Sequence, residues 1–260
     1  SDAEMERLIE QKREQGVFLS VLGFGMGNTK DSKMELLADK GNGNYAYIDS
    51  LLEAKKVLVR DMRKTLFTIA KNVKLQVEFN PARVASYRLI GYENRLLRKE
   101  DFRDDRKDAG EMGAGHTVTA FYEIIPAEGK KGQGQALKYQ DARIRPSAMR
   151  SRDLLTVHVR YQEPEGGAGK EFSAILKDGS RSIEEASRSM RFASSVAEFG
   201  LLLRQSPHRG QASWARLIQR ARQALGEDAF GYRHEFVQLA ELAELLSPAP
   251  PDPKEQAGKE

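Results

Sequence analysis

A strand–helix–strand pattern over residues 16–49 constrains the fold of this chain more than any other feature. The strand from Val17 to Leu22 is an apolar run that only Ser20 interrupts, which is typical of a strand covered on both faces in a parallel sheet. A short amphipathic helix follows and ends at Gly41, and residues 44–49 read as a second strand. The pattern predicts two parallel strands joined by a right-handed crossover.

A longer amphipathic segment follows this unit and closes the α/β part near residue 72. Ser50 is placed to cap the helix, because its hydroxyl can accept a hydrogen bond from the first turn, and Glu53 completes a capping box. The apolar residues of this helix recur at a spacing that predicts one buried face: Leu51, Ala54, Val57, Leu58, Met62 and Leu66.

From residue 73 the hydrophobic period changes to two. Val73, Leu75, Val77 and Phe79 alternate with polar residues, so we expect a strand with one solvated face. Further strands are expected over residues 84–94, 116–125, 154–161 and 172–176. Residues 96–115 read as a charged loop, and residues 127–152 read as a polar excursion with little to bury. Strands without intervening helices predict an antiparallel sandwich or half-barrel.

The rest of the chain is expected to be helical, with helices over residues 183–197, 213–225 and 229–246. The fold class is therefore an α+β multidomain chain. Its expected parts are a partial α/β domain (residues 1–72), an antiparallel β-sandwich-like domain (73–180), a helical segment that packs on the β domain (181–247) and a disordered tail (248–260).

The amino-acid composition argues against several kinds of functional site and several classes of protein. The chain has no cysteine, which excludes disulfides, thiolate catalysis and cysteine-ligated metals. Its 42 basic and 38 acidic residues nearly cancel, so the charge does not indicate a nucleic-acid binder. No apolar run is long enough to span a bilayer.

The glycine-rich turn from Gly23 to Gly27 invites a nucleotide-binding interpretation, because it follows a strand and precedes a helix. The spacing of a dinucleotide fingerprint is not met: the third glycine is replaced by Asn28 or by Lys30, depending on where the motif starts. A nucleotide-binding enzyme that uses this turn remains one alternative function; the other is a weak polyanion binder that uses the run from Arg143 to Arg152.

Four segments together resemble a known family: residues 16–49, 71–97, 101–126 and 229–243. In order, they are similar to the C-terminal part of bacterial von Willebrand factor type A (vWA) proteins of the YfbK-like group. The resemblance implies the last strands and helices of a vWA domain, followed by the C-terminal region of that group. It also implies a cell-envelope or periplasmic location, since members of the group tend to carry a lipoprotein or export signal.

The same resemblance implies where a metal would bind. The metal-ion-dependent adhesion site of vWA domains is built from loops of the part that precedes this segment, so no Mg²⁺ ligand is carried over and no cofactor is expected in this fragment. A strand buried on both faces needs neighbours, and only one parallel partner follows the strand from Val17 to Leu22. We therefore expect that strand to have an exposed edge, through which the chain can self-associate or which the helix of residues 3–15 covers.

Asp178, Ser180 and Ser182 fit the spacing Asp-x-Ser-x-Ser and offer the oxygen ligands that Mg²⁺ prefers. The segment before them is too polar for a central strand, and no second ligand loop follows. The alternative is a tight turn in which Ser182 caps the next helix with support from Glu185.

Other polar groups have a structural interpretation. The acids at 101, 104, 105, 108 and 111 lack the spacing of an EF-hand loop, and the four histidines are scattered along the chain. The basic run from Arg143 to Arg152, with Lys138 before it, would support weak binding to a polyanion, but a solvated loop is the default.

The resemblance, together with the absence of a catalytic grouping in the sequence, implies a non-enzymatic protein-interaction module from the C-terminal region of a vWA-type envelope protein. Its partner is expected to be a protein, with no nucleic acid and no membrane span. The metal candidates in the sequence are Asp178, Ser180 and Ser182, and no catalytic or cofactor-binding residue is predicted.

Overall fold

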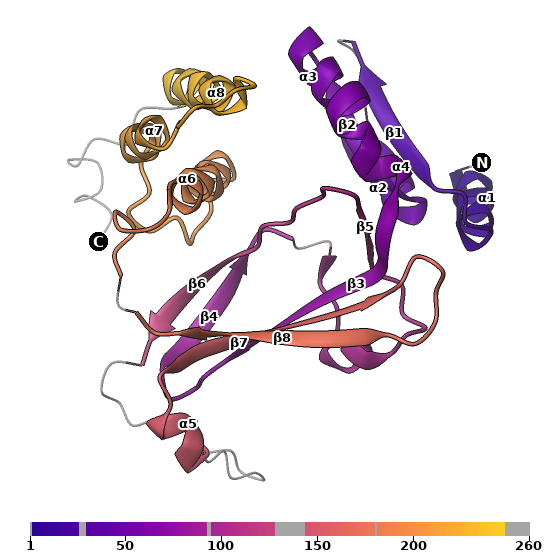
Figure 1. The fold of residues 1–260 in the computed structure, drawn as a ribbon. Coiled ribbons are helices and arrows are strands. Elements are labelled where there is room, and N and C mark those ends of the chain that lie inside the picture. Colours follow the sequence, from indigo (N-terminus) through magenta and orange to yellow (C-terminus); the bar gives the residue numbers. More distant parts are fainter. Residues whose placement is uncertain (1, 26–29, 93–94, 128–143, 180, 248–260) are drawn as a thin grey trace, which may run out of the picture. The chain divides into compact units, whose positions relative to one another are not determined.

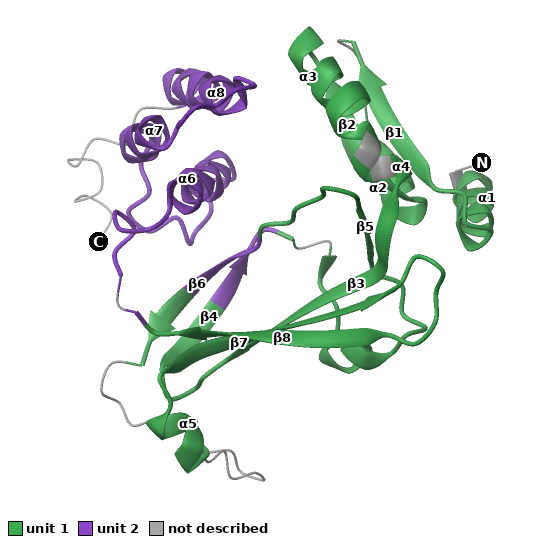
Figure 2. Cartoon of the chain, viewed as in Figure 1, with its two compact units in different colours: residues 1–87, 92–119, 124–178 green, residues 88–91, 120–123, 179–260 purple. Residues whose placement is uncertain are grey.

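The computed structural model describes residues 2–25, 30–92, 95–127, 144–179 and 181–247. The chain separates into two compact units (Figure 2). The first unit comprises residues 1–87, 92–119 and 124–178, and the second comprises residues 88–91, 120–123 and 179–260. The elements of the first unit include a small parallel α/β layer and a larger antiparallel sheet (Figure 1).

The α/β layer consists of α1 (Asp2–Glu14), β1 (Leu19–Phe24), α2 (Asp31–Lys40) and β2 (Asn42–Ile48). β1 and β2 pair in parallel, with Leu22 opposite Ala46, which confirms the strand–helix–strand prediction. The strands approach closely at Gly43, where an added Cβ would lie 1.8 Å from the carbonyl oxygen of Leu19.

The predicted bounds of the first strand are wrong by two residues. Val17 does not belong to β1, because its amide donates to the carbonyl of Lys12 (3.0 Å) and the left-handed Gly16 turns the chain there. The expected burial on both faces is also wrong, since only Gly23 of β1 is buried among its six residues.

The segment after β2 forms three short helical pieces: α3 (Leu51–Lys55), the π-helical η1 (Lys56–Arg60) and α4 (Met62–Leu66). The Ser50 cap is confirmed, because its hydroxyl accepts a hydrogen bond from the amide of Glu53 (3.2 Å). The predicted buried face is wrong: α3 and η1 contain no fully buried residue, and Leu51 and Val59 are exposed.

The antiparallel sheet contains β3 (Thr68–Phe79), β5 (Gly110–Gly113), β7 (Asp153–Gln162) and β8 (Lys170–Lys177), in the order β5-β3-β7-β8. A separate pair is formed by β4 (Val84–Ile90) and β6 (Phe121–Pro126). The rings of Phe79 and Tyr87 stack with their centroids 4.2 Å apart and so join β3 to β4. The mixture of antiparallel sheets with a small parallel pair agrees with the predicted fold class, whereas the domain boundaries stay a prediction.

Several predicted limits differ from the structure. The first long strand begins at Thr68 rather than at residue 73, and β6 begins at Phe121 rather than at residue 116. The predicted charged loop of residues 96–115 contains the 3-10 helix η3 (Lys99–Arg103) and β5, because Phe102 is buried there. The polar excursion contains α5 (Pro146–Arg150).

At the centre of β3, the predicted pattern of buried apolar and exposed polar residues is reversed. Lys74 is only 3% exposed, whereas Leu75 is 51% exposed. The register places Leu75, Val159 and Phe172 in one row across the sheet and Lys74, Arg160 and Glu171 in the next row, on the opposite face. The polar face is the covered one, because η3 packs against β3 and the ammonium group of Lys74 donates to two carbonyl oxygens of residues 101–104.

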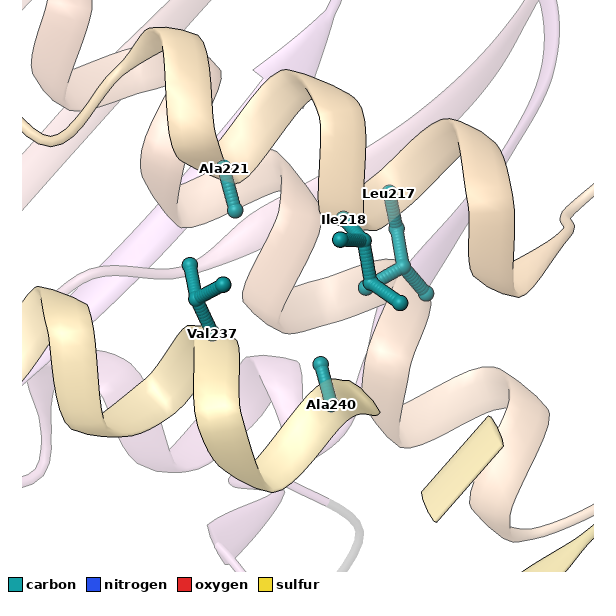
Figure 3. Packing of buried hydrophobic residues seen from close by; sticks show 5 residues of the cluster. All are labelled: Leu217, Ile218, Ala221, Val237 and Ala240. Atoms are coloured by element: carbon teal, nitrogen blue, oxygen red, sulfur yellow. The ribbon is translucent and has the colours of Figure 1, made fainter. Parts of the chain in front are cut away.

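The second unit has three longer helices, α6 (Arg188–Leu203), α7 (Trp214–Gln223) and α8 (Tyr232–Leu246). α6 begins five residues later than predicted, and its cap is Ser187 rather than Ser182, since the Ser187 hydroxyl accepts from the Met190 amide (3.2 Å). The core of this unit is formed by buried residues of α7 and α8 (Figure 3): Leu217, Ile218, Ala221, Val237 and Ala240. The rings of Phe199 and Trp214 meet edge to face beside this cluster.

We expect Leu217→Ala to destabilise the second unit by about 2–5 kcal/mol, because the fully buried side chain would leave a cavity. The matched control is Leu245→Ala on α8, where the side chain is 82% exposed and the change should be within about 0.5 kcal/mol. Trp214 is the single tryptophan, so urea unfolding followed by its fluorescence reports on this unit. Equal midpoints for the two variants would contradict the packing.

Candidate functional site

The structure describes two of the three predicted metal ligands, Asp178 and Ser182. Asp178 belongs to the first unit and Ser182 to the second, while Ser180 lies outside the described residues. The backbone of Asp178 is hydrogen-bonded to Arg152 in both directions. The amide of Ser182 donates to the carboxylate of Glu185 (2.9 Å). Within the described residues, no group of three or more His, Asp or Glu side chains is placed to hold a metal ion, and the metal site stays a prediction.

The other sequence motifs are also only partly described. In the glycine turn, residues 26–29 lie outside the described residues, and the Tyr47 hydroxyl donates to the carbonyl of Gly25. In the basic run, Lys138 and Arg143 lie outside them as well. Arg145 precedes α5, Arg150 ends it, and the Arg152 side chain donates to the carbonyl of Asp178 (3.3 Å).

The polar face of the antiparallel sheet holds the densest set of charged contacts among the described residues. Lys74 Nζ donates to the carbonyl oxygens of Asp101 (3.2 Å) and Asp104 (2.6 Å), which fixes residues 98–108 over the strand. Because the ammonium is buried, these two bonds replace the water that it has lost.

Asp105 forms the second fixed contact of this segment. Its carboxylate accepts hydrogen bonds from the guanidinium of Arg160 (2.9–3.1 Å) and from the amide of Gly169 (3.1 Å). The Gly169 amide and the Arg160 guanidinium together lower the pKa of Asp105 below its usual range. An added Cβ at position 169 would lie 2.5 Å from Asp105 Oδ1 and would displace the side chains of this pair.

The remaining acids of this face are paired in the same way. Glu171 accepts two hydrogen bonds from Arg103 (3.1 and 3.2 Å), and His158 lies 3.7 Å from the same carboxylate. The hydrogen bonds from Arg106 hold the pKa of Asp104 well below its usual range. Of the acids that were predicted to be solvated in a loop, Asp104, Asp105 and Asp108 are paired with arginine. The network on this face acts as a structural clamp.

A polar hollow of about 330 Å³ lies beside this clamp, at the end of α1 and the start of β3. Its lining includes Arg13, Lys71, Asp108 and Glu111, and Arg13 pairs with Asp108 at 3.1 Å. The Oε2 atom of Glu111 is buried and has no hydrogen-bond partner among the described residues. Burial raises the pKa of Glu111 to about 7; the charge of Asp108 acts in the same direction, and that of Lys71 opposes it.

The hollow therefore presents a carboxyl group that changes its charge near neutral pH. Sequence reasoning missed this role of Glu111, because its spacing matches no motif and the effect arises from burial beside residues of other elements. The nearest signal in the sequence is the start of a short strand directly after a charged run.

A further candidate surface is apolar. The side chains of Leu51, Val59 and Leu66 on α3, η1 and α4 are 87%, 66% and 65% exposed. Large exposed apolar residues close together in the chain make this segment a candidate for contact with another protein. None of the helices in the described parts of the chain has the length and apolarity needed to cross a bilayer.

We expect the stability of the first unit to fall as the pH rises from about 4.5 to 7. The folded chain keeps the Glu111 proton in that range, whereas the unfolded chain, with the ordinary pKa of 4.5, has released it. Because Glu111 is only half-buried, the loss should be on the order of 1 kcal/mol rather than the full value for a buried carboxyl.

Glu111→Gln should remove this part of the pH dependence in scanning calorimetry between pH 4.5 and 8. Glu165→Gln, which changes an exposed glutamate in the turn between β7 and β8, is the control and should keep the wild-type profile. Identical profiles for wild type and Glu111→Gln would show that the carboxyl does not titrate in this range.

Comparisons with known proteins show which family this chain resembles. The family described as "Uncharacterized protein YfbK, C-terminal" matches residues 64–246. The chain is 42% identical over 240 residues to "Uncharacterized protein YfbK" of Escherichia coli (strain K12). The aligned region covers 92% of this chain and 41% of that protein. The chain thus spans about two fifths of the length of this curated relative. No solved structure matches.

The predicted resemblance to the YfbK-like group is confirmed by both matches. The family match begins at α4 and includes the antiparallel sheet and the three helices of the second unit. The identity to the relative covers nearly the whole chain. The chain belongs to the family of YfbK C-terminal regions.

Proposed function

We propose that this chain is a non-enzymatic protein-interaction module, the C-terminal region of a vWA-type protein of the bacterial cell envelope. The observation that carries the proposal is the exposure of three apolar residues of one segment, Leu51, Val59 and Leu66, which we call the apolar row. Burying one such side chain is worth about 1.5–3 kcal/mol, so a partner that covers the row gains several kcal/mol.

The parallel pair supports the vWA part of the proposal. Parallel strands are stable when both faces and both edges are covered, and sheets of this kind have several strands. In the described residues β1 pairs only with β2, and β2 pairs only with β1. A partner that supplies further parallel strands and an apolar surface would complete the layer. In this proposal any Mg²⁺ would belong to the part that supplies those strands.

The pairing of the acidic side chains with arginines supports a role without catalysis. Asp104, Asp105 and Glu171 are each bonded to an arginine, and the Asp105–Arg160 and Arg103–Glu171 pairs hold residues 98–108 on the sheet. Such fully paired carboxylates are suited to fixing a surface rather than to transferring protons. The envelope location rests on the resemblance to the YfbK-like group alone.

Site-specific photo-cross-linking in bacterial cells tests the proposal. A photoreactive amino acid at position 59 should cross-link the full chain to a protein of the envelope fraction, because Val59 lies in the apolar row. The control places the same group at Lys55, an exposed polar position in the preceding turn, where little cross-linking is expected. Equal products from both positions, or products from neither, would contradict the proposal. A product found only with cytoplasmic proteins would contradict the location.

A further inference from the structure

β8 is an edge strand with unusual exposure. All eight residues from Lys170 to Lys177 are exposed, and β7 is its only strand partner in the described part of the chain. The other edge of the same sheet is β5, which has four residues. A long exposed edge with apolar side chains presents free backbone groups to another strand.

The two faces of β8 follow from its register with β7. Phe172, Ala174 and Leu176 lie opposite Val159, Val157 and Leu155 and therefore share the apolar face of the sheet. Glu171 and Lys177 lie on the other face, with Ser173 and Ile175 between them. The strand thus carries an acid near one end and a base at the other.

We propose that β8 pairs with β8 of a second copy of this chain, antiparallel, about a two-fold axis at Ala174. This register places Phe172 opposite Leu176 of the second copy on the apolar face, with the two Ala174 residues facing each other. On the opposite face Glu171 meets Lys177, and the symmetry makes each of these contacts twice. Two four-stranded sheets thereby join into one continuous sheet.

The charge pattern favours this register over its neighbours. An axis at Ser173 would place Glu171 opposite Ile175, and an axis at Ile175 would place Ser173 opposite Lys177. Only the axis at Ala174 pairs the acid with the base and the large apolar residues with each other. Glu171 already accepts hydrogen bonds from Arg103, and a carboxylate has room for another donor.

The self-complementary order of side chains identifies the partner as a second copy. Beyond the strand, Lys170 would face Asp178 of the other copy, which adds another pair of opposite charges at each end. In residues 170–178 the facing positions therefore match in charge or in apolar character, except for Ser173 opposite Ile175. An unrelated strand has no reason to match these residue types position by position.

Cysteine cross-linking tests the proposal, because the chain contains no cysteine of its own. In the proposed dimer the two copies of position 174 face each other at a distance suited to a disulfide. The Ala174→Cys chain should become mostly a covalent dimer under mild oxidation. The Ser173→Cys chain is the control and should stay largely uncross-linked, because position 173 faces position 175.

The mass of the unmodified full chain provides the second measurement. Light scattering should give twice the chain mass of 29.2 kDa, and Lys177→Glu should raise the dimer dissociation constant about tenfold or more, since two acids would then face each other. Lys177 is exposed at the strand end, so its variant should keep the wild-type circular dichroism spectrum. A monomer at all concentrations would overturn the proposal. A dimer that Lys177→Glu leaves unchanged, or that cross-links better through position 173, would also overturn it.

Discussion

The ordering of residues 98–108 over β3 is the interaction on which the first unit depends. β3 is the longest strand and pairs with β5 on one side and with β7 on the other. Lys74 at its centre is buried and donates to two carbonyl oxygens of the charged segment. Removing a partner of a buried ammonium is costly, because the group has lost its water. The charged segment is therefore part of the folded sheet rather than a solvated loop.

In the first unit, some surfaces of the described elements are covered by other residues and others are exposed. Arginine–carboxylate pairs and a buried phenylalanine, Phe102, cover the polar face of the sheet. The opposite face and the edge strand β8 remain exposed, as do the apolar side chains of α3, η1 and α4. In the described residues of the first unit, the charge pairs therefore cover the polar face, while large apolar side chains such as Leu51 and Phe172 stay exposed.

Local patterns in the sequence predicted the elements, whereas contacts between distant residues decided what they bury. The period of two identified β3, and strands were also expected where β7 and β8 lie. The cap at Ser50 was visible because a capping hydroxyl acts within three residues. The burial of Lys74 was not visible, because its acceptors lie 27 and 30 residues later in the chain. The same holds for Glu111, whose raised pKa depends on burial and on Lys71 and Asp108. The serine at 182 looked like a cap, but Ser187 has that role.

Hydrogen–deuterium exchange of the full chain, read by mass spectrometry, tests the central claim most directly. Several amides within residues 99–110 are hydrogen-bonded, among them that of Asp104 to the carbonyl of Asp101 and that of Ala109 to the side chain of Asn72. Peptides from residues 99–110 should therefore exchange far more slowly than an unstructured chain and should lose protection together with β3 as denaturant is added. Exchange of this segment at the rate of an unstructured peptide, while β3 stays protected, would contradict the account.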